Sequence, residues 1–148
     1  MADDKYDCLK LENQVCFPLY ACSKEIINRY RPLLDKLDIT YTQYITMMVL
    51  WEERSLSVKE LGCRLYLDSG TLTPLLKRLD RQGYIRRVRP EDNERKLFLS
   101  LTEEGEKLRE KAKLVPGQMQ GCLPLEWEEL VQLKALLDRA LKNMDAKN

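Results

Sequence analysis

The stretch LSVKELGCRLYLDSGTLTPLLKRLDRQGYI, residues 56–85, decides the fold. In its first part, Ser57 followed three residues later by Glu60 forms the pattern of a capping box, in which side chains satisfy backbone N–H groups at a helix start. This pattern predicts a short helix over about residues 57–65. The tetrapeptide YLDS then makes a turn, so the stretch reads as two helices joined by a turn, a helix-turn-helix.

The helix after the turn has one apolar face and one polar face. Asp68 or Ser69 caps its start, and Gly83 ends it. Pro74 lies in or just past its first turn, where the loss of a backbone N–H costs least. Four leucines at helical spacing form the face that packs inward, namely Leu72, Leu75, Leu76 and Leu79.

The opposite face of this helix is suited to DNA. Hydroxyl and methyl groups near its start can reach base edges in a major groove, whereas basic side chains further along reach phosphates. The N–H groups at the helix start can also contact a phosphate. The candidate DNA-contacting residues of this segment are Ser69, Gly70, Thr71, Thr73, Pro74, Lys77 and Arg78.

The sequence period then changes to that of strands. Ile85, Val88 and the run KLFLSL (96–101) predict two strands joined by the polar, turn-forming segment RPEDNE (89–94). Arginine side chains near the tip of such a hairpin suit a narrow minor groove. The candidates are Arg87, Arg89 and Arg95.

Charge is concentrated in the same part of the chain. Residues 77–96 contain eight basic and four acidic side chains, a local charge of +4 in a chain whose net charge is +1. Such a patch is typical of a surface that binds a polyanion. A solvated charged face would explain the charge by itself, but not a capped helix pair followed directly by a basic hairpin. Double-stranded DNA is therefore the predicted partner.

Helical patterns lie on both sides of this segment. Apolar residues three and four apart predict a helix within residues 9–37, which Pro18 and Pro32 kink or delay. A second, buried helix is predicted over about 41–53.

Two more helices are predicted after the hairpin. One begins at Thr102 and reaches about residue 115, and a break with two glycines and two prolines follows it. The last amphipathic helix covers about 125–145, with apolar residues at helical spacing.

The predicted fold class is mainly α with a small β-hairpin wing: a winged helix-turn-helix with N- and C-terminal dimerisation helices. We expect a single domain over residues 1–148. Within it, residues 41–101 form the DNA-binding lobe. Residues 9–40 and 102–145 carry more apolar surface than one small domain needs and are expected to pair in a homodimer.

The cysteines and the missing histidines narrow the chemistry. The five cysteines, at 8, 16, 22, 63 and 122, form no CxxC pair, and the chain has no histidine. This composition argues against a metal site, and we expect no cofactor. Ser-His and Cys-His nucleophile pairs are also excluded, and we do not expect an enzyme.

Nothing in the sequence predicts a membrane segment. The longest apolar run, residues 45–51, is too short to cross a bilayer. The acidic start MADDKYD lacks the pattern of a signal peptide. We therefore expect a cytoplasmic protein with reduced cysteines and no membrane partner.

Several motifs at preserved spacing resemble one family. They are LENQVCFPLY (11–20), LDITYTQY (37–44), LYLDSGTLTPLLKRL (65–79) and ERKLFLSLTEEG (94–105). Over residues 9–145 they resemble the MarR family of dimeric repressors, and in combination its OhrR-type branch. The resemblance implies a transcriptional repressor that binds a pseudo-palindromic operator and responds to organic hydroperoxides. One motif departs from the family: the wing has Asn93-Glu94-Arg95 where Asp-x-Arg is usual, with Asp92 one place early.

The resemblance also implies roles for particular side chains. Cys16 is the redox-sensing thiolate, and Tyr30 and Tyr41 of the other subunit donate hydrogen bonds to it. A hydroperoxide oxidises the thiolate to a sulfenic acid, a second thiol condenses with it, and the operator is released. Cys122, which follows the flexible Gly121, matches the resolving cysteine of two-cysteine members, offset by about one residue. A small cellular thiol is the alternative.

The residues alone leave other interpretations open for the thiols. Without the family, Cys16 would be assigned to core packing. Pro18 either starts the regular helix, placing Cys16 at its positive end, or kinks a longer helix. Cys122 could simply pack, as free cysteines commonly do. Cys22 and Cys63 are expected to pack in the core, and Cys8 to be an adventitious thiol near the N-terminus.

Two rival functions remain. Within the same fold, a small phenolic or lipophilic ligand could relieve repression from a cleft between the DNA-binding lobe and the dimer helices. From a different class, the chain could be a thiol peroxidase that uses Cys16 catalytically, although no recycling CxxC pair is present.

Overall fold

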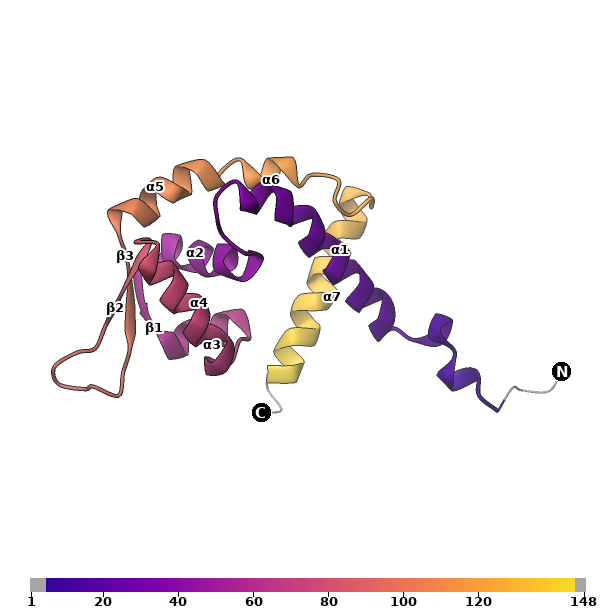
Figure 1. Cartoon of the computed structure of the whole chain (residues 1–148). Coiled ribbons are helices and arrows are strands. Elements are labelled where there is room, and N and C mark those ends of the chain that lie inside the picture. The colour runs from indigo at the N-terminus through magenta and orange to yellow at the C-terminus, as the bar shows by residue number, and fades with distance from the viewer. Residues whose placement is uncertain (1–4, 146–148) are drawn as a thin grey trace. The chain divides into compact units, whose positions relative to one another are not determined.

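The computed structural model describes residues 5–145. The chain divides into two compact units, residues 1–118 and 119–148, which are described over 5–118 and 119–145. The first unit begins with two 3-10 turns, Asp7–Leu9 and Leu11–Asn13. Its helices are α1 (Cys16–Asp35), α2 (Tyr41–Glu53), α3 (Val58–Leu65), α4 (Ser69–Arg81), α5 (Glu103–Ala112) and α6 (Val115–Gln118) (Figure 1). Its strands are β1 (Ser55–Ser57), β2 (Ile85–Val88) and β3 (Phe98–Leu101). The second unit contains α7 (Trp127–Asp145). The predicted class is confirmed, a mostly helical chain with a small antiparallel sheet.

The helix-turn-helix forms through local capping. The N–H of Glu60 donates to Ser57 Oγ at 3.2 Å, and the N–H of Ser57 donates to Glu60 Oε2 at 2.8 Å, so the predicted capping box starts α3. Helix α3 ends at Leu65, and the next residue, Tyr66, caps it in the left-handed conformation with φ of 54°. Asp68, rather than Ser69, caps α4, because its Oδ1 accepts the N–H of Thr71 at 2.7 Å.

The predicted leucine face of α4 lies in the core. All four of its leucines are at most 9% exposed. Met47 and Leu50 of α2, Ile85 of β2 and Leu99 of β3 are also 0–1% exposed. Burying this much apolar side chain is the main stabilising contribution to the unit, and it holds α4 against α2 and the sheet.

The sheet has three strands, in the order β1–β3–β2, and both pairs are antiparallel. Two strands were predicted, so β1 is a correction. Its three residues, Ser55 to Ser57, pair with residues more than 40 positions later, and Leu56 lies opposite Leu99. A strand this short has no visible alternation of its own, and its last residue is also the cap of α3.

Helix α1 begins at Cys16, so the late start allowed by Pro18 is what occurs, and residues 9–15 are not part of it. Side-chain amides hold the preceding turns: Asn13 donates to the Asp7 carbonyl and Gln14 to the Cys8 carbonyl, each at 2.8 Å. Pro32 lies inside α1 without ending it.

The helices after the wing also differ from the expected bounds. Helix α5 ends at Ala112 rather than near residue 115, and α6 occupies the beginning of the predicted break. Pro116 is its second residue, a position where proline is tolerated. Helix α7 begins at Trp127, two residues later than predicted.

Gly105, near the start of α5, lies where three elements meet. Trp51 Nε1 of α2 donates to the Gly105 carbonyl at 2.9 Å. The Gly105 N–H donates to Thr102 Oγ1 at 3.0 Å, and that hydroxyl donates to the Gly83 carbonyl at 2.5 Å. A Cβ on Gly105 would lie 2.2 Å from the Tyr84 carbonyl oxygen, so only glycine fits here.

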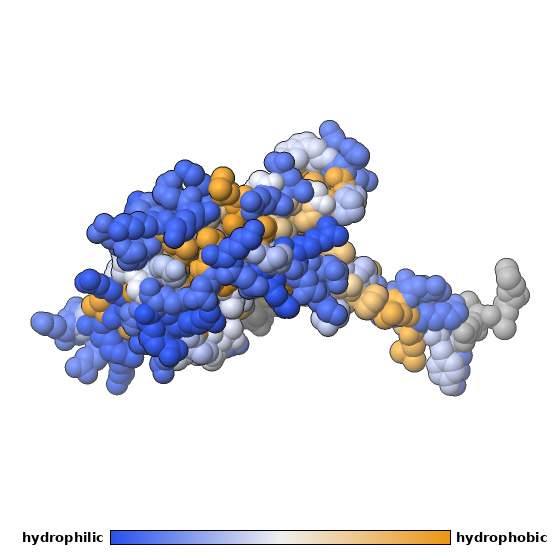
Figure 2. All heavy atoms as spheres, turned by 45° about the horizontal axis from the view of Figure 1, so that its top comes forward, coloured by the Kyte–Doolittle hydropathy of each residue, from blue (hydrophilic) through white to orange (hydrophobic). Residues whose placement is uncertain are grey.

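Each long terminal helix leaves apolar side chains exposed. Helix α1 buries only Leu34, and its exposed residues include Phe17, Leu19 and Tyr20; Val15, just before the helix, is also exposed. In α7 no residue is buried, and Trp127, Val131, Leu136, Leu141 and Met144 are exposed. Apolar side chains are visible along the N-terminal segment at the right of Figure 2. None of the helices in residues 5–145 combines the length and apolarity that a bilayer crossing requires.

Candidate functional site

Helix α4 presents the predicted polar face to solvent. Thr71, Thr73, Pro74 and Lys77 are exposed, as are Ser69, Gly70 and Arg78. Asp68 accepts hydrogen bonds from the backbone N–H and the side chain of Thr71, and these bonds hold the pKa of its carboxyl below the ordinary value. The start of α4 is therefore fixed by a charged cap, and its first turns are available to a groove.

The C-terminal half of α4 is attached to the turn between α1 and α2. Arg78 Nη2 donates to Asp38 Oδ1 at 3.1 Å, and Gln82 Nε2 donates to the Asp38 carbonyl at 2.7 Å. Asp38 has φ of 53°, a left-handed conformation that aspartate tolerates better than most residues. Arg78 was predicted as a DNA contact, and one of its five N–H donors is engaged here.

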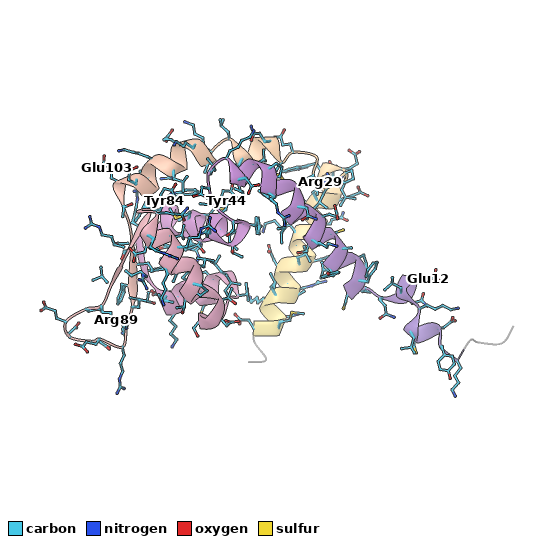
Figure 3. The ribbon with its side chains drawn as sticks, viewed as in Figure 1. Glu12, Arg29, Tyr44, Tyr84, Arg89 and Glu103 are labelled. Carbon is cyan, nitrogen blue, oxygen red and sulfur yellow. The ribbon has the colours of Figure 1, made fainter. Side chains whose placement is uncertain are left out.

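The wing is the loop between β2 and β3, drawn at the lower left of Figure 1. Arg87 Nε donates to Asp80 Oδ2 of α4 at 2.9 Å, so this arginine fastens β2 to α4. Arg89 lies further out on the wing (Figure 3), where its Nη1 donates to the Glu94 carbonyl at 2.7 Å. Arg89 thus closes the loop, while the Arg87 side chain, 30% exposed, ties β2 to α4.

Arg95 is exposed, and its backbone N–H donates to Asn93 Oδ1 at 3.2 Å. Across residues 5–145, no carboxylate lies within ion-pair distance of its guanidinium. Asn93 stands where the family motif usually has an aspartate, so it supplies no charge to Arg95.

Cys16 is the first residue of α1 and is exposed. Pro18 falls in the first turn, so of the two roles open to this proline, it starts the regular helix. Val15 precedes the helix, and no side-chain hydrogen bond caps its first N–H groups. The thiol is therefore at the end of α1 where the helix dipole favours a negative charge.

Tyr30 and Tyr41 lie together, with ring centroids 4.9 Å apart. Tyr44 completes the cluster, with its ring centroid 5.8 Å from that of Tyr30 and 6.4 Å from that of Tyr41. Burial raises the pKa of Tyr41 above 10.0, and burial together with Tyr41 raises the pKa of Tyr44. These phenols therefore stay protonated and can act as donors at neutral pH.

The tyrosines cannot reach the thiol of their own chain. Cys16 and Tyr30 are both in α1, 14 residues apart, which is about 21 Å along a helix that rises about 1.5 Å per residue. A hydrogen bond between these groups therefore requires a second copy of the chain.

A cavity of about 500 Å³ borders the tyrosine cluster. Its apolar walls come from Ile27, Leu34, Ile39 and the ring of Tyr41, and Arg31, Asp35, Asp38, Thr40 and Arg78 complete its lining. This composition suits a mostly apolar molecule with a polar end.

The other cysteines are surface thiols. Cys22 and Cys63 were predicted to pack, but both are exposed, so that prediction is wrong within one chain. Cys22 lies in α1, where Leu34 is the only buried residue, and Cys63 lies in α3, where Leu61 is the only buried residue. Cys8 is exposed, and Cys122 is half-buried after Gly121, whose φ is 76°.

Sequence reasoning missed four residues of these sites. Asp38, Gln82 and Asp80 fasten α4 to its surroundings, and Tyr44 joins the tyrosine pair. Only Tyr44 had a usable signal, since it lies one helical turn after Tyr41. Within residues 5–145, no group of three side chains suited to metal binding occurs.

Comparison with known proteins establishes the family. Residues 23–112 match the family profile described as transcriptional regulator SarA/Rot. The chain is also 51% identical over 146 residues to the organic hydroperoxide resistance transcriptional regulator of Bacillus subtilis strain 168, with 99% of both chains covered. The chain belongs to the MarR-type transcriptional regulators of the organic-hydroperoxide branch.

Solved structures of similar proteins support this family assignment. Reduced AbfR of Staphylococcus epidermidis bound to DNA matches 97% of this chain and 98% of its own, with a TM-score of 0.79 at 33% identity. The disulfide form of AbfR matches 90% of this chain and 96% of its own, with a TM-score of 0.63 at 38% identity. MarR-type relatives are regulators rather than enzymes, which argues against the thiol peroxidase alternative.

Proposed function

We propose that the chain is a homodimeric transcriptional repressor of the cytoplasm that releases its operator when an organic hydroperoxide oxidises Cys16. The observation that carries the proposal is the position of Cys16 at the exposed, uncapped start of α1. The chain that holds it is 51% identical to a hydroperoxide-resistance regulator.

The DNA-binding part rests on α4 and the wing. In a two-fold dimer, two recognition helices about 34 Å apart enter successive major grooves of a pseudo-palindromic operator. Lys77 and the remaining donors of Arg78 contact phosphates, and Arg89 and Arg95 follow the backbone or the minor groove. Arg87 acts indirectly, since its bond to Asp80 sets the direction of the wing.

The dimer rests on the apolar faces of residues 9–40 and 102–145. Helices α1 and α7 leave large apolar side chains exposed, and a second copy covers them most simply. Dimerisation also brings Cys16 of one subunit to the tyrosines of the other. Within one chain, Cys16 and Tyr30 are too far apart along α1 to form a hydrogen bond.

The sensing chemistry begins with the Cys16 thiolate, which Tyr30 and Tyr41 of the other subunit stabilise by hydrogen bonds. The thiolate attacks one peroxide oxygen, the O–O bond breaks, and the alkoxide leaves and takes up a proton as the alcohol. Cys16 becomes a sulfenic acid, two electrons more oxidised. The cavity beside Tyr41 offers apolar walls to the organic group of the hydroperoxide.

A second thiol then completes the switch. The thiolate of Cys122 from the other subunit attacks the Cys16 sulfur, the S–OH bond breaks, and the hydroxide leaves and takes up a proton as water while the disulfide forms. Gly121, with its left-handed backbone, gives this loop the freedom to move into disulfide range. Cys16 then loses its hydrogen bonds from the tyrosines and gains a covalent bond to the other subunit. These changes shift the dimerisation helices, which set the distance between the two α4 helices, and the operator is released.

Mass spectrometry of the intact protein, with operator release followed in parallel, tests this proposal. One equivalent of organic hydroperoxide should produce a Cys16 adduct or disulfide at the same rate as DNA release. Release without any change in mass at Cys16 would contradict the proposal.

The cavity also supports one rival, a regulator relieved by a small phenolic or lipophilic ligand. Tyr41 and Arg31 could hold the polar end of such a ligand, and the isoleucines its ring. Under this alternative, a Cys16→Ser protein would still release DNA with the ligand, and peroxide would have no effect on either protein.

A further inference from the structure

The hydroxyl group of Thr73, in the second turn of α4, is hydrogen-bonded within the helix. Thr73 Oγ1 donates to the Ser69 carbonyl one turn earlier, at 2.7 Å. The Thr71 N–H donates to Asp68 Oδ1 at 2.7 Å, so the cap holds the turn that precedes Thr73 in place. Thr73 is exposed, and because its hydroxyl donates to the helix backbone, the γ-methyl group is the part of its side chain left for a ligand.

Two residues on the same face as Thr73 add no hydrogen-bonding side chain. Gly70 has no side chain, and a Cβ there would lie 3.1 Å from Asp68 Oδ1, against the cap. Pro74 is exposed and offers only its ring. On the helix, Gly70 and Pro74 are four residues apart and share one face, with Thr73 beside them. The outward surface at Gly70, Thr73 and Pro74 is therefore chiefly methyl and methylene groups.

We infer that this surface reads the 5-methyl groups of thymine. Thymine is the only base with an apolar group at its major-groove edge, and threonine methyls contact it well. Thr73 and Pro74 contact the thymine methyl group. Lys77, one turn further along the same face, contacts a phosphate and so sets how deeply α4 enters the major groove. The inference rests on the proposed DNA binding and adds the kind of base recognised, by apolar contact instead of by hydrogen bonds.

Deoxyuridine substitution tests this inference, because deoxyuridine lacks only the 5-methyl group. The reduced protein is first used to recover its tightest duplex from a random-sequence pool, and each thymine of that duplex is then replaced singly by deoxyuridine. One thymine or two adjacent thymines per half-site should each lower affinity by about fourfold, the factor for losing one buried methyl-sized group.

Matched threonine variants identify the residue responsible. Thr73→Ser keeps the hydroxyl and loses the methyl, so the deoxyuridine effect at its thymine should vanish. Thr73→Val keeps a methyl in the same place and loses only the hydroxyl, so the fourfold effect should persist.

The outcomes separate this inference from the function on which it rests. A protein that selects no duplex would overturn the DNA-binding proposal itself. A selected duplex with no sensitive thymine, or a Thr73→Ser protein with undiminished sensitivity at every thymine, would overturn the inference and leave DNA binding standing. Circular dichroism of both variants confirms that α4 is intact.

Discussion

Gly105→Ala tests how tightly α5 is joined to the DNA-binding lobe. The new Cβ would lie 2.2 Å from the Tyr84 carbonyl oxygen and 2.7 Å from Leu101 Cδ1. Real Cβ contacts are essentially never shorter than 3.0 Å, so α5 or the turn at Tyr84 must move by about 0.8 Å. Backbone atoms form the closest contact, and a side-chain rotation cannot relieve it.

A movement of that size breaks the bonds that hold the joint. The bonds from Trp51 to the Gly105 carbonyl and from the Gly105 N–H to Thr102 are 2.9 and 3.0 Å long, and about 0.8 Å more takes either beyond hydrogen-bonding distance. Two lost bonds, one of them buried, and the strained packing at Leu101 together cost about 2–4 kcal/mol. For a chain of this size the midpoint of thermal unfolding should fall by about 6–12 °C.

Thermal and urea unfolding of reduced Gly105→Ala measure the effect. Gly117→Ala is the matched control, because no atom lies within 4 Å of a Cβ at that helical position, so it should be neutral or stabilising by up to about 1 kcal/mol. A Gly105→Ala protein as stable as Gly117→Ala would refute the tight joint at α5.

Three further predictions concern the charge, the thiols and the tyrosines. Lys77→Ala should weaken binding to all duplexes and flatten the slope of log affinity against log salt by about one unit; an unchanged slope would remove its phosphate role. On non-reducing gels, hydroperoxide should link two chains through Cys16 and Cys122, so Cys122→Ser should abolish the dimer band and Cys63→Ser should leave it unchanged. Because burial raises the pKa of Tyr41, the unfolded chain loses this proton first and stability should fall as pH rises above about 10. Tyr41→Phe should reduce that loss in alkaline unfolding experiments, and an identical pH profile would contradict the burial of the phenol.

Features encoded locally were predictable from the sequence. The capping box of α3, the cap of α4 and the leucine face all depend on residues within one or two helical turns, and each forms as expected. Ser69 was an equal candidate for the α4 cap, and the backbone geometry favours Asp68.

Features that depend on distant parts of the chain were not predictable. Strand β1 exists only because it pairs with β3, more than 40 residues later. Asp38 contacts Arg78 across 40 residues, and nothing in either local pattern signals the contact. Cys22 is a second example, because it was expected to be buried and is exposed. An apolar stripe in the sequence does not show whether the surface that covers it belongs to the same chain or to another one.

The most direct test of redox sensing compares the native protein with Cys16→Ser bound to a fluorescent operator duplex. One equivalent of cumene hydroperoxide should release the duplex from the native protein, and a reductant should restore binding. Cys16→Ser should bind the duplex and keep it through the same treatment. Release of the duplex from Cys16→Ser at the native rate would contradict the account.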